Sequence, residues 1–178
     1  MYKVSLLVTT YNSVVNLPIT LNSIQEQTYE NIEIIIVDGK STDGTVALIE
    51  QFVKISRYEV KWVSEPDKGL YDAMNKGIGV ANGELIGIVN SDDWYEMDTI
   101  EQIVKHYQGN AKEVVYGMQR TFLNGKEKAT FIYHHEFLPE QMITHPTCFV
   151  TKEAYQELGV FDLKYRSAAD YDLMLRFY

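Results

Sequence analysis

Four short apolar runs, each followed by apolar residues at helical spacing, fill the first half of the chain. The first of them, "VSLLVT", is a short continuous apolar run, as in a strand that is buried on both faces of a sheet. Strands and helices that alternate in this way predict a parallel sheet with right-handed crossover connections. Asn12 or Ser13 is a candidate cap for the first helix. The predicted strands are residues 4–9, 32–37, 60–63 and 84–89.

The second half of the chain has a different pattern. The segments "EVVYG" and "TCFV" are further predicted strands, and Asn124-Gly125 between two strand-like runs is a strong hairpin signal. "KEAYQEL" predicts a short helix that ends at Gly159, and "AADYDLMLRFY" predicts a last helix. No Gly, Pro or polar tail closes that helix, so we expect that the chain is cut short at its C-terminal end. We predict one α/β domain over residues 1–178, because no linker divides it.

Composition and charge exclude several classes of function. The formal net charge is −9, and a chain with this charge has no cationic field to attract nucleic acid nonspecifically. Cys148 is the only cysteine, which excludes a disulfide framework within the chain and a zinc site built from thiolates. No apolar run approaches the roughly 18 residues that a membrane-spanning helix needs. We therefore expect a cytoplasmic protein, and peripheral contact with the membrane stays open.

Polar side chains follow each of the four predicted parallel strands, where the strand ends. In a parallel sheet these ends lie at one edge, and ligands bind in the crevice outside it. Topology alone therefore predicts that Tyr11, Asp38, Asp67 and Asp92 converge on one rim. Asp38 is not needed as a helix cap, so its carboxylate is a candidate acceptor for a hydrogen bond from a base or a ribose.

Two adjacent carboxylates, Asp92 and Asp93, follow the fourth predicted strand in the segment "NSDDWY". Neighbouring like charges repel, so the pair indicates a cation. Mg²⁺ binds through one or two carboxylates together with substrate phosphates, and a rigid strand end would hold both side chains in place. The alternative is a polar turn in which one aspartate caps the next helix. The position at the rim favours the cation site.

Three further patterns bear on the chemistry. The fingerprints of dinucleotide-binding and P-loop proteins, G-x-G-x-x-G and G-x-x-x-x-G-K-[ST], are absent. The four histidines have no metal-binding spacing. Asp170 and Asp172 are two positions apart on the last predicted helix, which places them on different sides of it. One is a candidate cap and the other a candidate general base, if the fold brings this helix to the rim.

Four segments, taken in order, resemble the inverting glycosyltransferases of family 2, which have the GT-A fold. "VSLLVTTYN" is similar to the first strand and nucleotide-binding turn of that family, and "IIIVDGKSTDGT" to its "VDGGSTDGT" segment. "SEPDKGLYDAMNKGIGVANGE" followed by "NSDDWY" resembles the central helix and the metal motif, and "GVFDLKYRSAADYDLMLR" the segment with the catalytic base. The likeness covers nearly the whole chain.

This resemblance implies roles for individual residues. The nucleotide sugar would be bound by Thr9, Tyr11, Asp38, Asp67, Lys68 and Asp92, a metal ion by Asp92 and Asp93, and the acceptor hydroxyl would lose its proton to Asp170. The chain departs from the family at three positions: Asn90 stands where Asp is frequent, Lys40 where Gly is, and Ala169 where Glu is. The neutral Asn90 leaves open which of the two adjacent aspartates contacts the metal and which contacts the ribose.

By the same resemblance we expect metal-dependent transfer, with Mg²⁺ or Mn²⁺, of a sugar from a nucleotide-diphosphate sugar to an acceptor hydroxyl. The resemblance also implies that UDP would be the preferred nucleotide and that the transfer would invert the anomeric centre. The expected architecture is a mostly parallel central sheet flanked by helices, with a nucleotide-binding half at 1–95 and a hairpin-containing acceptor half at 96–178. The acceptor would be a glycan or a lipid-linked molecule in surface polysaccharide assembly, at the inner face of the membrane.

Two other interpretations of the motifs stay open. A sugar-1-phosphate nucleotidyltransferase uses a similar nucleotide-binding sheet, but its Gly- and Arg-rich loop is absent after the first strand, where the chain has "TYNSVVN". A non-catalytic nucleotide-sugar-binding domain would keep the fold without the chemistry. The intact set of Asp38, Asp92, Asp93 and Asp170 argues against that second alternative.

Overall fold

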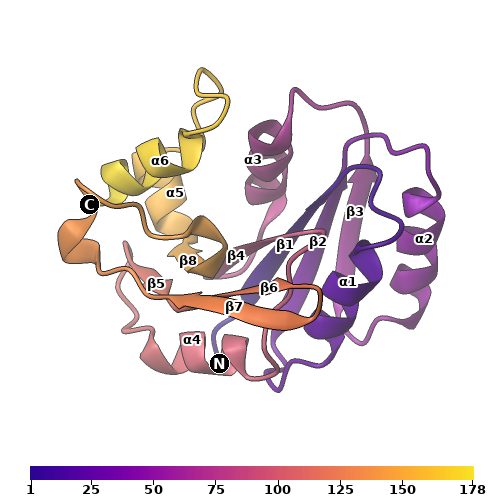
Figure 1. The fold of residues 1–178 in the computed structure, drawn as a ribbon, viewed down its shortest axis with the longest axis horizontal. Helices are drawn as coiled ribbons and strands as arrows, with labels where there is room; N and C mark the ends of the chain where they lie inside the picture. Colours follow the sequence, from indigo (N-terminus) through magenta and orange to yellow (C-terminus); the bar gives the residue numbers. More distant parts are fainter.

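A six-stranded sheet and a separate two-stranded hairpin form the framework of the protein (Figure 1). The computed structural model describes every residue from 1 to 178. The strands of the sheet are β1 (Val4–Thr10), β2 (Ile32–Asp38), β3 (Glu59–Ser64), β4 (Leu85–Asn90), β5 (Val114–Tyr116) and β8 (Cys148–Thr151), and those of the hairpin are β6 (Gln119–Leu123) and β7 (Lys126–Phe131). The helices are α1 (Leu17–Gln25), α2 (Thr45–Ile55), α3 (Leu70–Val80), α4 (Thr99–His106), α5 (Lys152–Leu158) and α6 (Ala169–Phe177), with 3-10 turns η1 (His135–Phe137) and η2 (His145–Thr147). None of the helices combines the length and the apolar character that crossing a membrane requires.

The strand order in the sheet, β3-β2-β1-β4-β8-β5, locates a ligand crevice. β1 pairs in parallel with β2 and with β4, and β2 pairs in parallel with β3, so the predicted parallel sheet is confirmed. The chain runs outward from β1 through β2 to β3 and then returns to β4 on the other side of β1. This reversal opens a crevice beyond the carboxyl ends of β1 and β4, where open α/β sheets bind ligands.

Two strands from the second half of the chain extend the sheet beyond β4. β8 pairs antiparallel with β4, and β5 at the outer edge pairs antiparallel with β8. The predicted strands "TCFV" and "EVVYG" are therefore confirmed, although their order in the sheet was not predicted from the sequence. The sheet is mostly parallel, as expected, and it continues without a break into the second half of the chain.

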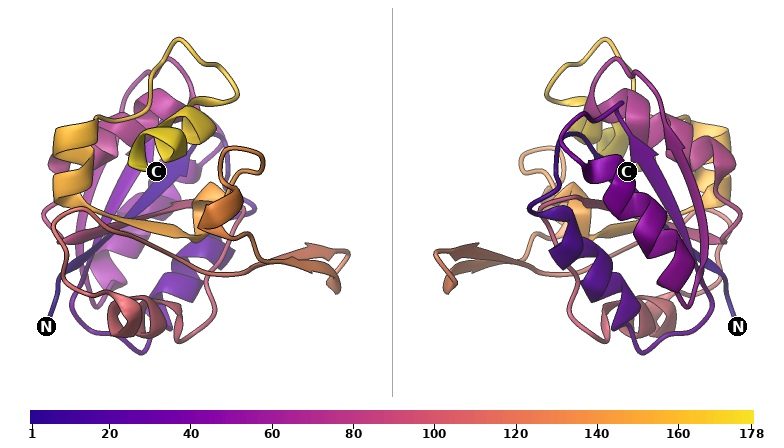
Figure 2. Two further views of the ribbon diagram at one scale, coloured as in Figure 1. Left: turned by 90° about the vertical axis from the view of Figure 1, so that its left-hand side faces the viewer. Right: turned by 90° about the vertical axis from the view of Figure 1, so that its right-hand side faces the viewer.

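Helices cover both faces of the sheet and enclose two apolar cores (Figures 1 and 2). One core lies under α1, α2 and α4, and the other lies under α3, α5 and α6. Successive residues of β1 serve the two cores in turn, since Leu6 packs in the first and Leu7 in the second. Ile34 and Ile35 do the same in β2. Each fully buried side chain of this size contributes about 1.5–3 kcal/mol, which explains why most residues of these strands are apolar.

The loops that follow β1 and β2 are tied to each other by side chains. Asn12 has a φ of 47°, and its side-chain oxygen accepts the backbone N–H of Thr42 at 2.9 Å. Asp43 accepts a backbone N–H from the β1–α1 loop at 3.1 Å. The prediction that Asn12 or Ser13 caps the first helix is wrong: α1 begins at Leu17, and Asn12 instead joins the two loops.

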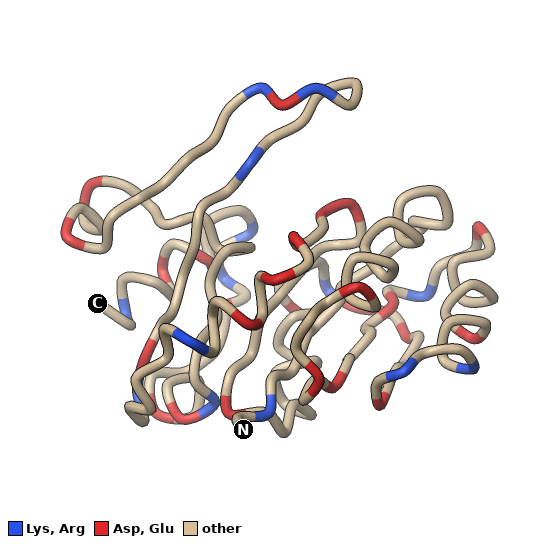
Figure 3. Tube along the Cα trace, turned by 90° about the horizontal axis from the view of Figure 1, so that it is seen from below, with Lys and Arg blue, Asp and Glu red and all other residues tan.

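The hairpin β6–β7 projects from the body of the protein, as the two side views show (Figure 2). Its turn consists of Asn124 and Gly125, with φ values of 53° and 71°. Two successive positive φ values are the requirement of a type I′ turn, which confirms the hairpin predicted from Asn-Gly. Lys126, Glu127 and Lys128 follow directly, so the projecting end carries charges of both signs (Figure 3).

A buried carboxylate stabilises the sheet near the amino-terminal ends of its parallel strands, opposite the crevice. Glu33 in β2 is fully buried, and its carboxylate accepts hydrogen bonds from Ser5 Oγ at 2.6 Å, Asn82 N–H at 2.6 Å and Lys61 Nζ at 2.9 Å. Lys3 Nζ lies 3.1 Å from Glu33 Oε2. Burial favours the protonated acid, but the donors led by Lys61 and Ser5 outweigh it and lower the pKa of Glu33 to about 2.

Replacing Glu33 with Gln is expected to lower the free energy of unfolding at pH 7 by about 3 kcal/mol, because the buried network loses its charge. A depressed pKa stabilises the folded state above the unfolded value near 4.5, and this contribution disappears as the pH falls toward 2. Urea unfolding at pH 7 and pH 3 should therefore show a smaller difference between variant and wild type at pH 3. Glu59→Gln is the control, since Glu59 contacts the same lysines but is 58% exposed. A loss for Glu59→Gln as large as for Glu33→Gln would contradict this account.

Candidate functional site

A cleft of about 440 Å³ occupies the crevice between the carboxyl ends of β1 and β4. The ends of these two strands form its floor, and the turn before α3 and the first turn of that helix form one wall. Because three separate segments meet there, the cleft exists only in the folded chain. The lining includes Thr9, Tyr11, Asp67, Leu70, Asn90 and Asp92.

Asn90 connects the floor of the cleft to the acidic pair. The Thr9 hydroxyl donates to Asn90 Oδ1 at 3.1 Å, and Asn90 Nδ2 donates to Asp93 Oδ2 at 3.4 Å. An aspartate at position 90 would have no hydrogen to donate and would bring a third negative charge beside the pair. The neutral residue that departs from the family pattern is therefore the one that this geometry accommodates.

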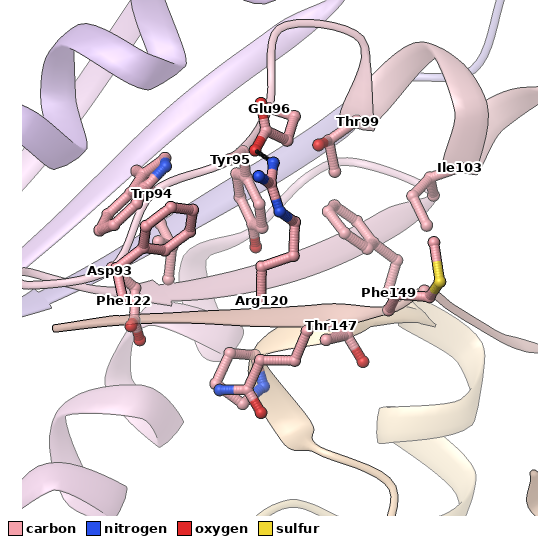
Figure 4. Close-up of a pocket in the computed structure, with 15 residues that line it drawn as sticks. Asp93, Trp94, Tyr95, Glu96, Thr99, Ile103, Arg120, Phe122, Thr147 and Phe149 are labelled. Carbon is pink, nitrogen blue, oxygen red and sulfur yellow. Dashed lines mark hydrogen bonds and ion pairs between the residues drawn. The ribbon is translucent and has the colours of Figure 1, made fainter. Parts of the chain in front are cut away.

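The two adjacent aspartates face different cavities. Asp92 is exposed in the cleft, and its carboxylate has no hydrogen-bond or ion-pair partner within the protein. Asp93 instead lines a second cavity of about 140 Å³ on the α4 side of the sheet, beside Trp94 and Phe122 (Figure 4). Burial, and next the charge of Asp92, raise the pKa of Asp93 above its usual value. The sequence suggested one cation site for both carboxylates, but the structure offers the cleft only Asp92.

Asp38 lies beneath the rim and not on it. It is fully buried, and its carboxylate accepts hydrogen bonds from the backbone N–H of Ser41 at 2.9 Å and from the hydroxyl of Ser64 at 2.6 Å, as well as from the hydroxyl of Ser41. The expectation that it presents a free acceptor to a base or ribose is not met, because its oxygens are occupied by the chain. These bonds hold the turn at Lys40, whose φ of 64° is in the region that favours the Gly common in the family.

The third of the expected rim carboxylates, Asp67, occupies the space beside Gly39. A Cβ atom at Gly39 would lie 2.7 Å from Asp67 Oδ2 and 3.2 Å from the Tyr11 ring, so the absence of a side chain lets Asp67 approach. Its other oxygen accepts the backbone N–H of Gly69 at 2.9 Å. Lys68 is exposed and is not part of the cleft lining. Its backbone N–H donates a hydrogen bond to the Asp72 carboxylate. Of this pair, the structure brings only Asp67 to the cleft.

Asp170 and Asp172 take different partners at the start of α6. Asp170 Oδ1 accepts the Tyr71 hydroxyl at 2.9 Å, and Tyr71 directly follows the cleft residue Leu70. Asp172 Oδ2 lies 3.1 Å from Arg176 Nε, one turn further along the same helix. The two carboxylates therefore separate, as their spacing indicated, and only Asp170 contacts α3.

Two residues beside Asp170 have no signal in the sequence. Tyr71 belongs to no motif that marks it as a partner of a residue 99 positions away. His145 is one of the four histidines without metal-binding spacing, and the structure buries it and leaves its Nε2 without a hydrogen-bond partner. Burial lowers the pKa of His145 to about 4, and the opposing effect of Asp170 is smaller. No periodicity or spacing in the sequence signals either residue.

The donor set around Asp92 fits a divalent ion held jointly with a substrate. The structure brings together no group of three His, Cys, Asp or Glu side chains that would hold a metal by themselves. Mg²⁺ commonly binds proteins through one or two carboxylates and completes its shell with substrate phosphates and water. A single free carboxylate in an open cleft is compatible with that arrangement.

Comparisons with known proteins agree with the resemblance read from the motifs. The model of the glycosyl transferase family 2 matches residues 5–160. A PGL/p-HBAD biosynthesis glycosyltransferase of Mycobacterium bovis is 30% identical over 177 residues, which are 97% of this chain and 68% of that protein.

Solved structures show the same architecture. TarS of S. aureus in complex with UDP superposes with a TM-score of 0.79 at 22% identity, over 99% of this chain and 55% of that one. The mannosyltransferase PcManGT of Pyrobaculum calidifontis, in complex with GDP-Man and Mn²⁺, gives a TM-score of 0.78 at 22% identity, over 99% of this chain and 52% of that one. The chain thus spans about half the length of these solved chains. The superpositions show the GT-A type of fold, and the family match with the curated relative shows that the chain belongs to glycosyl transferase family 2.

Proposed function

We propose that this chain transfers a sugar from a nucleoside diphosphate sugar, with UDP as the preferred nucleotide, to an acceptor hydroxyl with inversion. One observation carries the proposal: an unpaired carboxylate lies in the cleft at the reversal of strand order, and a second carboxylate lies across the first turn of α3. The first carboxylate would hold a cation beside the leaving diphosphate, and the second would accept the proton of the attacking hydroxyl. Membership of the family supports the same reaction.

The nucleoside end of the donor would lie against Tyr11, Thr9 and Asp67. The Tyr11 ring is 65% exposed at the cleft and offers a face for a base or a ribose to stack on. Asp67 Oδ2 is free of protein hydrogen bonds and is a suitable acceptor for an N–H or O–H of the nucleoside. Asp38 contributes indirectly, through the turn that it holds behind Gly39.

Asp92 would hold a divalent ion, Mg²⁺ or Mn²⁺, together with the diphosphate. When bound, such an ion neutralises the negative charge that develops on the leaving group. A chain with a net charge of −9 repels an anionic donor, so a cation at Asp92 also improves binding. The Mn²⁺ in the complex of PcManGT supports this part of the proposal.

Asp170 would act as the general base. The acceptor oxygen attacks the anomeric carbon from the face opposite the diphosphate, and its proton passes to the Asp170 carboxylate. The bond between the anomeric carbon and the diphosphate oxygen breaks as the new bond forms, and the electron pair leaves with the diphosphate. A single displacement of this kind inverts the anomeric centre.

The acceptor would be a glycan or a lipid-linked molecule in surface polysaccharide or glycan assembly, at the cytoplasmic face of the membrane. The name of the mycobacterial relative, which places it in PGL/p-HBAD biosynthesis, supports an acceptor of this kind. A transfer screen over nucleotide sugars with Mn²⁺ tests the proposal. Release of nucleoside diphosphate in the presence of acceptor is the expected result, and no turnover of any nucleotide sugar would contradict it.

Binding of UDP is expected to need a divalent ion. Calorimetric titration of UDP in the presence of Mn²⁺ should give a measurable affinity, and EDTA should weaken it by about tenfold or more, because the diphosphate then faces Asp92 without a counterion. UMP or uridine serves as the control, since a ligand without the diphosphate depends less on the metal. Equal affinity for UDP with and without EDTA would remove the metal from the site.

A further inference from the structure

We propose that Tyr71 is a positioning residue for Asp170. Its hydroxyl holds the Asp170 carboxylate so that one carboxylate oxygen stays available to the acceptor hydroxyl. The inference rests on the proposed function, because it takes Asp170 as the general base. The Tyr71 hydroxyl donates to Asp170 Oδ1 at 2.9 Å, and the backbone N–H of Tyr171 donates to the same oxygen at 3.0 Å. Oδ2 has no partner within the protein. Two donors on one oxygen therefore fix the plane of the carboxylate and leave the other oxygen free.

The Tyr71 ring is itself held in place by Phe161. It stacks on Phe161, with ring centroids 5.2 Å apart and planes 25° from parallel. Asn75, one turn after Tyr71 on α3, clamps Phe161 by its backbone: Phe161 N–H donates to Asn75 Oδ1 at 3.0 Å, and Asn75 Nδ2 donates to Phe161 O at 2.9 Å. The hydroxyl therefore meets Asp170 from a ring that cannot easily rotate away.

Tyr71 is also the one side chain that donates a hydrogen bond to Asp170. The His145 and Phe161 rings pack edge to face, with centroids 5.1 Å apart. Burial lowers the pKa of His145 to about 4, so its imidazole is neutral near pH 7. Burial, and next the hydrogen bond to Asp170, raise the pKa of Tyr71 above its usual value, so the phenol keeps its proton. Removing the Tyr71 hydroxyl would leave Asp170 with a single donor, the backbone N–H of Tyr171.

The same helical turn faces the donor cleft. Leu70 and Ala73 line the cleft, and Tyr71 projects from between them toward α6. A donor that settles against this turn thus contacts the element that carries the partner of the base. The geometry predicts that Tyr71 affects the chemical step and leaves donor binding to its neighbours.

Steady-state kinetics with the donor and acceptor found by the transfer screen test the inference. Tyr71→Phe removes the hydroxyl and keeps the ring, and it should lower kcat by about tenfold to a hundredfold, the effect of one hydrogen bond to a charged group. The KM for the donor should change by less than about twofold, because the cleft lining is intact. Tyr171→Phe is the matched control: it removes a hydroxyl that donates to Leu138 O at 2.9 Å and keeps the backbone donor to Asp170. An unchanged kcat in Tyr71→Phe, or an equal loss in both variants, would overturn the inference.

A double variant separates positioning from a general structural effect. If Tyr71 acts through Asp170, then Tyr71→Phe combined with Asp170→Asn should be no slower than Asp170→Asn alone. A further loss in the double variant, as large as the loss in Tyr71→Phe alone, would show that the tyrosine acts elsewhere.

A measurement without substrate keeps this inference distinct from the proposed function. In protein labelled with ¹³C at the phenolic carbon of tyrosine, the Tyr71 signal is identified by its loss in Tyr71→Phe. It should move in Asp170→Asn, and the Tyr171 signal should move less. A wild-type protein that transfers no sugar contradicts the proposed function. Normal wild-type transfer with a stationary Tyr71 signal contradicts only the positioning role.

Discussion

Replacing Asp170 with Asn is expected to lower the rate of sugar transfer by about 10²–10⁴-fold, the usual contribution of a general base. The substitution keeps the size of the side chain and removes its basicity. Donor affinity should stay nearly unchanged, because Asp170 is not part of the cleft lining. The measurements are kcat with saturating donor and acceptor, and calorimetric titration of UDP with the same variant.

Asp172→Asn is the matched control for this result. Asp172 pairs with Arg176 one turn along α6, and both side chains are about one third exposed. Such a pair contributes about 0.3–0.5 kcal/mol, so the variant should keep its rate and nearly all of its stability. An Asp170→Asn protein that transfers sugar at the wild-type rate would show that another group takes the proton.

Asp92→Asn is expected to lower kcat/KM by about 10²–10³-fold, since the leaving diphosphate would lose the cation that its carboxylate holds. Stability should hardly change, because the Asp92 carboxylate has no partner within the protein and is exposed in the cleft. The rate should be measured over a range of Mn²⁺ concentrations. If Asp92 binds the metal, the variant should need far more Mn²⁺ to reach its own maximum.

Asp93→Asn gives the sharpest comparison, because the two residues are adjacent and carry the same charge. Asp93 faces the second cavity beside Trp94, so its variant should keep at least ten times the turnover of Asp92→Asn. Removing one charge of a like-charged pair should also leave the fold as stable as before or slightly more stable. The reverse order of effects would assign the metal to Asp93.

Local pattern predicted β1, β2 and β4 well, because their burial on both faces makes them mostly apolar. It also predicted the hairpin, since Asn124-Gly125 satisfies a backbone requirement that few residue pairs meet. The parallel pairing followed from alternation, and with it a rim at the carboxyl ends of the strands, but the reversal of strand order that opens the crevice between β1 and β4 did not. These features depend on near neighbours in the chain or on rules that hold for all parallel sheets.

The direction of single side chains at the rim could not be predicted in the same way. Asp92 and Asp93 lie just beyond β4, where the backbone leaves the strand, and a small change in its path decides which cavity each carboxylate enters. Asp38 has two kinds of partner: Ser41 is only three residues away, but Ser64 is at the end of another strand, and that contact could not be read from the sequence. Tyr71 and Asp170 meet only through tertiary packing. Such contacts depend on the whole fold, and no local signal carries them.

The edge position of β5 has a consequence for how this fold varies. β5 pairs only with β8, so residues 117–147, with the projecting hairpin, form a loop that the sheet closes at both ends. The entropic cost of closing a flexible loop rises slowly with the length of the loop, by about 0.6 kcal/mol for each doubling. Insertions or deletions in the projecting hairpin, residues 119–131, therefore cost the sheet little, and the cleft between β1 and β4 is built without it. Evolution can therefore exchange the hairpin for a different one while the cleft between β1 and β4 stays as it is.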